Sequence, residues 1–290
     1  MDLSFFRRLI PGLVETEPKP PAVVGLALGG GAVRGAAHLG VLSVLEREHV
    51  PIGVVTGTSV GALVGAGVAA GVGSQDMLAA FSKSSWARIA LPSWTSKLSL
   101  LEADPLGALM ERVTHAETFD DLGLPFAAVA CDLLTGTSVV MTQGSLREAL
   151  IASSAIPGLF EPVRREGAML VDGGLVDNLP IDVASGLGAD YVIAVDVMPP
   201  LDGTYEPKDL RDVLLLSWNI VQRASERGRE RAGIVITPQV ATVPLSDFSK
   251  VGDAYQAGVV AAEAALPTLL ADLGMTATLD ATTGDSPPSG

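Results

Sequence analysis

The chain has 290 residues, of which 48% are hydrophobic and only 4% aromatic, and its formal net charge is −14. This length allows one large domain with a sizeable core. The acidic balance excludes the broad basic surface that a nucleic-acid partner requires. The single cysteine, Cys131, cannot form an intramolecular disulfide, and we expect it to be a buried structural thiol.

The two ends of the chain differ in composition from the region between them. Four prolines within residues 11–21 predict an N-terminal extension and linker over residues 1–22. The sequence TTGDSPPSG predicts a disordered tail over residues 276–290. No stretch provides the roughly 18–20 uninterrupted apolar residues of a transmembrane helix, and the N-terminus lacks the signal-peptide pattern. We therefore expect one folded domain over residues 23–275 in a soluble, cytoplasmic protein.

Between these ends, short apolar runs alternate with helical patterns. The runs are continuously apolar, which is typical of strands covered on both faces. Predicted strands lie at 23–28, 53–55, 126–132, 137–142, 168–172, 190–197 and 233–237. Predicted helices lie at 34–48, 59–71, 74–87, 104–113, 145–155, 180–188, 207–231 and 249–273. This alternation predicts an α/β fold of three layers, with helices on both faces of a mostly parallel central sheet.

A glycine-rich stretch, LALGGGAVRGAAHLGVL at 26–42, follows the first predicted strand. Several backbone N–H groups of such a loop can point at one anion, either a phosphate of a dinucleotide or the oxyanion of a reaction intermediate. The G-x-G-x-x-G spacing fails, because Arg34 and Ala32 stand where glycines are needed, and no G-K-[ST] is present. These departures favour the oxyanion hole.

The second predicted strand runs into Gly57-Thr58-Ser59-Val60-Gly61, which matches the G-x-S-x-G nucleophile elbow. The glycines allow a tight turn, and the following helix places its positive dipole end at Ser59. A serine that only caps this helix is the structural alternative.

A serine nucleophile needs a proton acceptor. His115 is the only histidine after Ser59, and a histidine-dependent triad would require Asp76 or Asp104 as its acid. Both aspartates lie in helical or loop contexts far from a predicted strand end. Asp172, in MLVDGGLVDNLP, is the better candidate because it ends an apolar strand and precedes two glycines. Its structural alternative is a carboxylate that caps the next turn.

Residues 84–103 fit no strand pattern well. This segment contains two of the three tryptophans, Trp86 and Trp94. We consider two interpretations, a mobile cap over a site and a packed surface loop. If it is a cap, its apolar side chains line or cover an apolar channel.

Three ordered motifs, GGGAVRG at 29–35, GTSVG at 57–61 and DGG at 172–174, together resemble the patatin-like phospholipases. The stretch SSAIPGLFEPV at 153–163 is also similar to the sequence that precedes the aspartate in that family. The resemblance covers about residues 23–200 and implies a patatin-like catalytic domain over 23–275. It further implies a Ser–Asp dyad that works without histidine.

The resemblance assigns roles to residues of this chain. It implies that Ser59 is the nucleophile and Asp172 the general base, and that backbone N–H groups of Gly30, Gly31 and Ala32 form the oxyanion hole. The supporting positions of the motifs are Gly29, Arg34, Gly35, Gly57, Gly61, Gly173 and Gly174. Relatives often carry a fourth glycine where this chain has Ala32, and a methyl group there costs energy if the position needs a positive φ.

The implied activity is hydrolysis of fatty acyl esters of phospholipids or lysophospholipids through an acyl-serine, without a metal or another cofactor. The implied partners are the lipid substrate and, transiently and peripherally, the membrane surface. The alternatives are a histidine-dependent α/β-hydrolase esterase and a non-catalytic module that binds a nucleotide or a lipid.

Overall fold

The computed structural model describes residues 23–94, 96–198, 203, 206–207 and 210–276. The predictions for residues 1–22, and for the tail beyond its first residue, lie outside this part of the chain.

The main sheet has eight strands in the order β11-β10-β1-β2-β5-β9-β8, with β6 paired to β5. Five of them, β11, β10, β1, β2 and β5, run parallel to one another. Strands β6 and β9 pair antiparallel with β5, and β8 pairs antiparallel with β9. Their bounds are β1 Val24–Leu28, β2 Ile52–Thr58, β5 Phe126–Asp132, β6 Thr137–Met141, β8 Val163–Arg165, β9 Ala168–Asp172, β10 Tyr191–Val195 and β11 Ile234–Ile236. The mostly parallel sheet and each predicted strand are confirmed.

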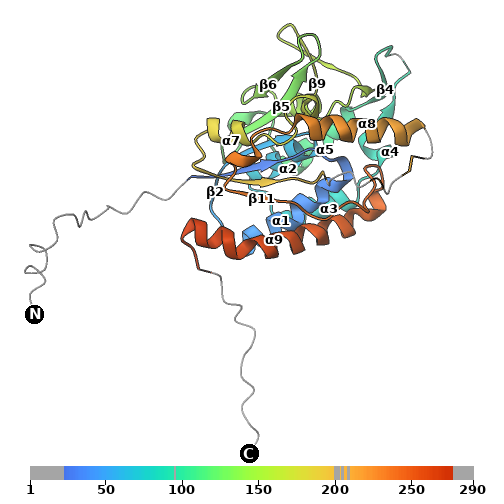
Figure 1. Ribbon diagram of the computed structural model, residues 1–290. Coiled ribbons are helices and arrows are strands. Elements are labelled where there is room, and N and C mark those ends of the chain that lie inside the picture. Colours follow the sequence, from blue (N-terminus) through green and yellow to red (C-terminus); the bar gives the residue numbers. More distant parts are fainter. Residues whose placement is uncertain (1–22, 95, 199–202, 204–205, 208–209, 277–290) are drawn as a thin grey trace, which may run out of the picture.

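Helices cover both faces of this sheet, because alternate side chains of each strand point to opposite sides. Leu26 and Leu28 of β1 join the larger core cluster, whereas Ala27 packs with Ile181 in a second cluster. Figure 1 shows α1, α3 and α9 below the sheet and α7 and α8 above it. The bounds are α1 Ala36–Arg47, α2 Val60–Ala69, α3 Ser74–Ser82, α5 Asp104–Thr114, α6 Leu146–Ser153, α7 Ile181–Gly186, α8 Leu210–Ser225 and α9 Val251–Leu273. The three-layer α/β/α prediction is confirmed.

The helices α1 and α9 pack unusually closely. A Cβ atom at Gly40 would lie 2.0 Å from the carbonyl oxygen of Tyr255, and one at Gly258 would lie 2.0 Å from that of Ala37. Glycine at both positions therefore lets the two backbones touch. This contact anchors the C-terminal helix to the helix that follows the glycine-rich loop.

Residues 84–103 form regular structure where no pattern predicted it. They contain the short helix α4 (Trp86–Ile89) and the strands β3 (Leu91–Pro92) and β4 (Ser99–Glu102), which form an antiparallel hairpin. We call residues 91–102 the β3–β4 hairpin. A second sheet is completed by β7 (Gly158–Phe160), which pairs with β4. Strands this short show no alternation, so tertiary pairing and not local sequence decides their structure.

Candidate active site

Ser59 lies on a sharp turn between β2 and α2. Its backbone has φ 54° and ψ −127°, which is a strained conformation for a residue with a side chain. A Cβ at Gly57 would lie 2.3 Å from the carbonyl oxygen of Gly61, and a Cβ at Gly61 would lie 2.1 Å from that of Leu28. The turn thus needs both glycines of the motif, and its geometry is that of a nucleophile elbow.

The elbow is held by a side chain that the sequence analysis did not select. The N–H of Ser59 donates to Oγ of Ser153 at 2.9 Å, and this hydroxyl donates to the carbonyl oxygen of Val129 at 2.6 Å. Ser153 is fully buried at the end of α6. It therefore ties the strained turn to the centre of the sheet.

The pairing of β5 explains why Ser59 and Asp172 meet. Val129 and Ala130 of β5 both pair with β6 on one edge. On the other edge, Val129 pairs with Thr58 at the end of β2, and Ala130 pairs with Asp172 at the end of β9. Because β2 is parallel and β9 antiparallel to β5, the carboxyl ends of the two strands face each other along one edge. The nucleophile candidate and the acid come from strands that end head to head.

Asp172 is completely buried, and its surroundings set its acidity. Burial raises its pKa to about 7, while the Ser59 side chain and the N–H of Gly174 act in the opposite direction. Oδ1 accepts a hydrogen bond from this N–H at 2.8 Å, so the carboxylate also caps the next turn. Among the described residues, Oδ2 has no partner of standard hydrogen-bond geometry. In apo structures, the hydrogen bond between a catalytic base and its partner is often long, and it reaches standard geometry only when substrate binds.

In the glycine-rich loop, some backbone N–H groups donate hydrogen bonds within the protein, and others are available to a ligand. The N–H of Gly29 donates to Val195 O at 3.1 Å, and that of Gly30 donates to Asn178 O at 3.2 Å. In the described part of the chain, the N–H groups of Gly31 and Ala32 have no such acceptor. Gly30 instead allows close packing, since a Cβ there would lie 3.2 Å from Cβ of Ser59. The two later residues are therefore the available oxyanion donors.

Ala32 has φ 48°, so this position does need a positive φ and the methyl group is strained. Ala32 also lines the same cavity as Ser59. The N–H of Val60, the first residue of α2, likewise has no acceptor among the described residues and lies directly after the serine. In an elbow of this type, that N–H serves as a further oxyanion donor.

The buried side chains of Arg34 and His38 hold the glycine-rich loop in place. Nε of Arg34 donates to Val243 O at 2.7 Å. Nε2 of His38 lies 2.8 Å from Gly29 O, and burial lowers the pKa of His38 to about 4. His38 is therefore neutral at pH 7, and Nε2 donates because a carbonyl oxygen can only accept. The other histidines, His49 and His115, are exposed, and neither has a described contact with Asp172.

The inner face of α8 covers the aspartate loop with polar side chains. Nε2 of Gln222 donates to Oδ1 of Asn178 at 2.9 Å, and Oγ of Ser225 donates to Gly174 O at 2.9 Å. A Cβ at Gly30 would lie 2.8 Å from Nε2 of Gln222, which places this amide directly above the glycine-rich loop. The sequence analysis did not select these residues, although polar residues at 219, 222 and 225 recur at helical spacing and share one face of the helix.

An apolar cavity of about 120 Å³ opens beside Ser59. Its walls come mainly from α2, α3 and α5, with Ile89 of α4 and Phe160 of β7 completing them. The hypothesis that residues 84–103 line an apolar channel is thus right for Ile89. It is wrong for Trp94, which is 90% exposed and does not reach the cavity.

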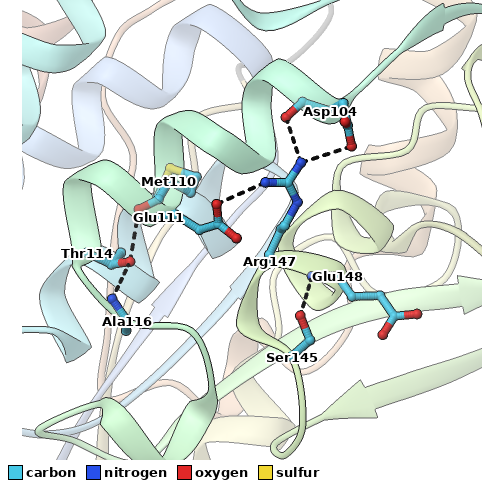
Figure 2. Close-up of polar contacts among 8 residues, drawn as sticks. All are labelled: Asp104, Met110, Glu111, Thr114, Ala116, Ser145, Arg147 and Glu148. Carbon is cyan, nitrogen blue, oxygen red and sulfur yellow. Dashed lines mark hydrogen bonds and ion pairs between the residues drawn. The ribbon is translucent and has the colours of Figure 1, made fainter.

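One arginine fixes the α5 wall of the cavity to α6. Figure 2 shows Arg147 of α6 reaching Glu111 and Asp104, which lie at two levels of α5. Its guanidinium donates to each carboxylate at 2.9 Å and to the Asp104 carbonyl oxygen at 3.1 Å. Because α6 ends at Ser153, this cluster links the cavity wall to the brace of the elbow. The predicted structural thiol, Cys131, is buried in β5.

The chain is similar to several known proteins. An NTE family protein of Mycobacterium tuberculosis is 39% identical over 178 residues, covering 60% of this chain and 49% of the relative. A lysophospholipase of Aspergillus fumigatus is 32% identical over 206 residues, covering 69% of this chain and 13% of that protein. The chain thus spans about half the length of the mycobacterial relative. Among solved structures, VipD from Legionella pneumophila has 13% identity and a TM-score of 0.47, covering 84% of this chain and 67% of that one.

The family model named patatin-like phospholipase matches residues 26–185. The matched region contains the glycine-rich loop, the elbow and the Asp-Gly-Gly turn. The chain belongs to the patatin-like phospholipase family.

Proposed function

We propose that the chain is a serine acyl hydrolase that cleaves fatty acyl esters of phospholipids or lysophospholipids. The observation that carries this proposal is the head-to-head ending of β2 and β9, which puts Ser59 next to Asp172 at the wall of an apolar cavity. The relative named as a lysophospholipase supports the substrate class.

In the first step, Asp172 accepts the hydroxyl proton of Ser59 as Oγ attacks the acyl carbonyl carbon. The carbonyl oxygen gains the negative charge, and the N–H groups of Gly31, Ala32 and Val60 stabilise it together with the dipole of α2. A carboxylate is ordinarily too weak a base for an alcohol. The buried position of Asp172 raises its basicity, since burial raises its pKa to about 7.

In the second step, the tetrahedral intermediate collapses and the alcohol part of the lipid leaves with the proton from Asp172. The acyl group stays on Ser59 as an ester. Water then attacks this ester and gives its proton to Asp172, and the fatty acid departs as Ser59 takes the proton back. The apolar cavity holds the acyl chain during both steps.

A fluorophosphonate probe tests the nucleophile, because it labels activated serines covalently. We expect labelling of Ser59, and neither labelling nor hydrolysis after Ser59→Ala. Labelling of another serine at the same rate in this variant would contradict the assignment.

A second experiment separates the dyad from a histidine-dependent triad. We expect Asp172→Asn to lower hydrolysis by at least the 10²–10⁴-fold typical of a lost general base. Replacing His38, His49 and His115 by glutamine should leave hydrolysis per folded molecule largely intact. Glutamine suits position 38 because its amide can still donate to Gly29 O. A folded triple variant without activity, beside an active Asp172→Asn, would restore the histidine-dependent esterase.

A third experiment measures turnover on esters of increasing acyl length. Because the cavity is apolar, we expect kcat/KM to rise from short to long chains. Narrowing the cavity by Leu63→Phe should shorten the preferred chain, and an unchanged profile would argue against the cavity as the acyl site.

A further inference from the structure

The helix α8 is amphipathic in the reverse of the usual sense. Its buried face carries the polar residues Asn219, Gln222 and Ser225, which cover the aspartate loop. Its outer face exposes large apolar residues at helical spacing, Leu210, Val213, Leu214, Ile220 and Val221. A surface helix normally turns its apolar stripe towards the core. An exposed stripe of this length marks a surface that meets another apolar phase.

A second exposed apolar element borders the same site. The β3–β4 hairpin exposes Leu91, Trp94, Leu98 and Leu100, and Trp94 has nine-tenths of its surface free. The hairpin is anchored through the pairing of Leu101 in β4 with Phe160 in β7, and Phe160 lines the cavity beside Ser59. In Figure 1, α8 and β4 lie on the side of the sheet opposite α9. Both elements therefore border the candidate site, the hairpin through Phe160 and α8 through Gln222.

The charge around the hairpin contrasts with that of the whole chain. The stretch 77–101 contains Lys83, Arg88 and Lys97 and no aspartate or glutamate, and Glu102 is the one acidic residue of the hairpin, although the chain carries a net charge of −14. Basic residues beside exposed tryptophan and leucine are typical of segments that lie in the interface of an anionic bilayer. Tryptophan is the residue most enriched at that depth.

We propose that the outer face of α8 and the β3–β4 hairpin together form a docking surface for an anionic lipid bilayer. This inference rests on the proposed function, because a lipid acyl hydrolase must meet its substrate at such a surface. Docking there holds the candidate site at the bilayer surface, where its lipid substrate is concentrated. Among the described residues, no helix is long and apolar enough to cross a membrane.

A second copy of the chain and a protein partner are the other possible occupants. An acidic partner surface is complementary to the three basic residues, but it does not cover an exposed tryptophan and an apolar stripe of about three helical turns at once. A second copy brings the same basic stretch to the interface, where like charges repel. The bilayer satisfies the apolar and the basic parts of the surface together.

Vesicle co-sedimentation of the Ser59→Ala chain tests the proposal without hydrolysis of the lipid. We expect binding to vesicles of phosphatidylcholine mixed with phosphatidylglycerol, and weaker binding to phosphatidylcholine alone. The double variants Trp94→Ser/Leu98→Ser and Leu214→Ser/Ile220→Ser should each lower the affinity about tenfold or more. A tenfold loss corresponds to less free energy than the burial of one large apolar side chain contributes. Lys97→Gln should lower affinity only for the anionic vesicles, and added salt should remove this difference.

The matched control is Val260→Ser on the outer face of α9, because Val260 is as exposed as Leu214, at 60% and 61%. We expect this control to bind like the parent. Equal binding of all variants, or no binding to anionic vesicles, would overturn the proposal. Loss of a dimer in sedimentation after Leu214→Ser/Ile220→Ser, with no vesicle binding, would assign the surface to a second copy.

The same docking variants, with Ser59 intact, are assayed on a soluble short-chain ester. We expect unchanged turnover on this substrate, with hydrolysis of anionic vesicles reduced in parallel with binding. Failure of the proposed function shows differently, as vesicle binding without hydrolysis of either substrate by the parent chain. The two proposals can therefore fail independently.

Discussion

The helices α8 and α9 cover opposite faces of the sheet and use opposite sides of their own surfaces. The inner face of α9 is apolar, with Ala254, Ala262 and Leu269 packed in the core. The inner face of α8 is polar, because it must pair backbone and amide groups of the aspartate loop that would otherwise be buried without partners. The α9 side is therefore built for stability, and the α8 side for positioning a site.

The difference extends to the residues beneath each helix. Under α9, Gly40 and Gly258 let α1 and α9 touch. Near α8, Asp172 is buried and Ser59 has a positive φ angle, whereas the turn that carries the strained Ala32 also contacts α9. Functional sites commonly carry destabilising features that the rest of the fold must offset. Substitutions that remove a destabilising feature of the site should then raise stability, whereas substitutions that disturb the contact between α1 and α9 should lower it.

The largest expected effect on the free energy of unfolding comes from Asp172→Asn. This substitution removes a buried ionisable group, but the asparagine oxygen can still accept the hydrogen bond from Gly174 N. The pKa of Asp172 rises from its ordinary 3.8 to about 7, a difference of about three units. A raised pKa means that the carboxyl stabilises the fold at low pH and that this contribution is lost as pH rises through about 7. At about 1.36 kcal/mol per unit, Asp172→Asn should be more stable than the parent by on the order of 4 kcal/mol above pH 7.

Denaturant unfolding at several pH values measures this effect. The advantage of Asp172→Asn should be small below pH 4, grow up to about pH 7 and stay constant above it. Asp120→Asn is a suitable control, since Asp120 is exposed, and its stability difference should change little over this range. A difference that shrinks as pH rises would contradict the burial of Asp172 as the cause.

The opposite sign is expected for Gly258→Ala on the α9 side. Alanine normally stabilises a helix over glycine by about 1 kcal/mol. Here its Cβ would lie 2.0 Å from Ala37 O, so α1 and α9 must separate. We expect a net loss of about 3 kcal/mol in the free energy of unfolding, as for overpacking in a rigid interface.

Gly252→Ala is the matched control for this prediction. Gly252 lies in the first turn of the same helix, and a Cβ there would meet nothing within 4 Å. Its substitution should be neutral or stabilising. A stabilising Gly258→Ala would show that the two helices can separate without loss, and would remove the contrast between the two sides.

Much of the fold could be predicted from sequence, because its main elements are local patterns. The apolar runs at 126–132 and 168–172 coincide with β5 and β9 to the residue. The hairpin strands could not be predicted in this way. Ser99–Glu102 is only four residues long, and its partner Gly158–Phe160 lies more than fifty residues later in the chain. Only the tertiary structure decides that these residues form strands.

The site divides in the same way. Ser59 and Asp172 lie in motifs with their own local geometry, so the sequence alone selected them. Ser153 was not selected, because its contact with the Ser59 N–H joins residues 94 positions apart. The use of the Gly30 N–H by Asn178 O likewise depends on a loop that no local pattern places there. Local motifs thus select the candidate reactive residues, but not the residues that hold them in place.

A smaller effect is expected from Gln222→Leu, which keeps the size of a side chain on the inner face of α8 but removes its donor. Oδ1 of Asn178 would then be buried without its partner. Leaving one such group unpaired costs about 1–2 kcal/mol. Because Gln222 packs above the glycine-rich loop, we also expect kcat to fall about tenfold with little change in KM.

Thermal unfolding and steady-state kinetics on a soluble ester measure the two effects of Gln222→Leu. Ser217→Ala is the control on the outer face of α8, since its hydroxyl only bonds within the helix, to Val213 O. We expect this control to keep full activity on the soluble ester. A fall in kcat of equal size for both variants would mean that the helix as a whole, and not the Gln222 amide, supports the site.

The smallest expected effect concerns Ala32, whose methyl group is held at φ 48° beside the nucleophile. Glycine adopts this backbone angle freely, whereas alanine is disfavoured there by about 1–2 kcal/mol. Part of the gain is lost because glycine is more flexible in the unfolded chain. Ala32→Gly should therefore raise stability by about 1 kcal/mol, which corresponds to about 2–4 °C in Tm for a domain of this size. The N–H at this position remains, so we expect kcat within about twofold of the parent.

Gly31→Ala is the informative counterpart, because its φ of 164° is extended and allowed, but its Cβ would lie 2.6 Å from Cγ2 of Val197. This variant should lose stability through packing and not through backbone strain. If Ala32→Gly gains stability but loses activity well beyond twofold, the strained angle itself holds the oxyanion donor in place, and the strain stored in the glycine-rich loop serves catalysis directly.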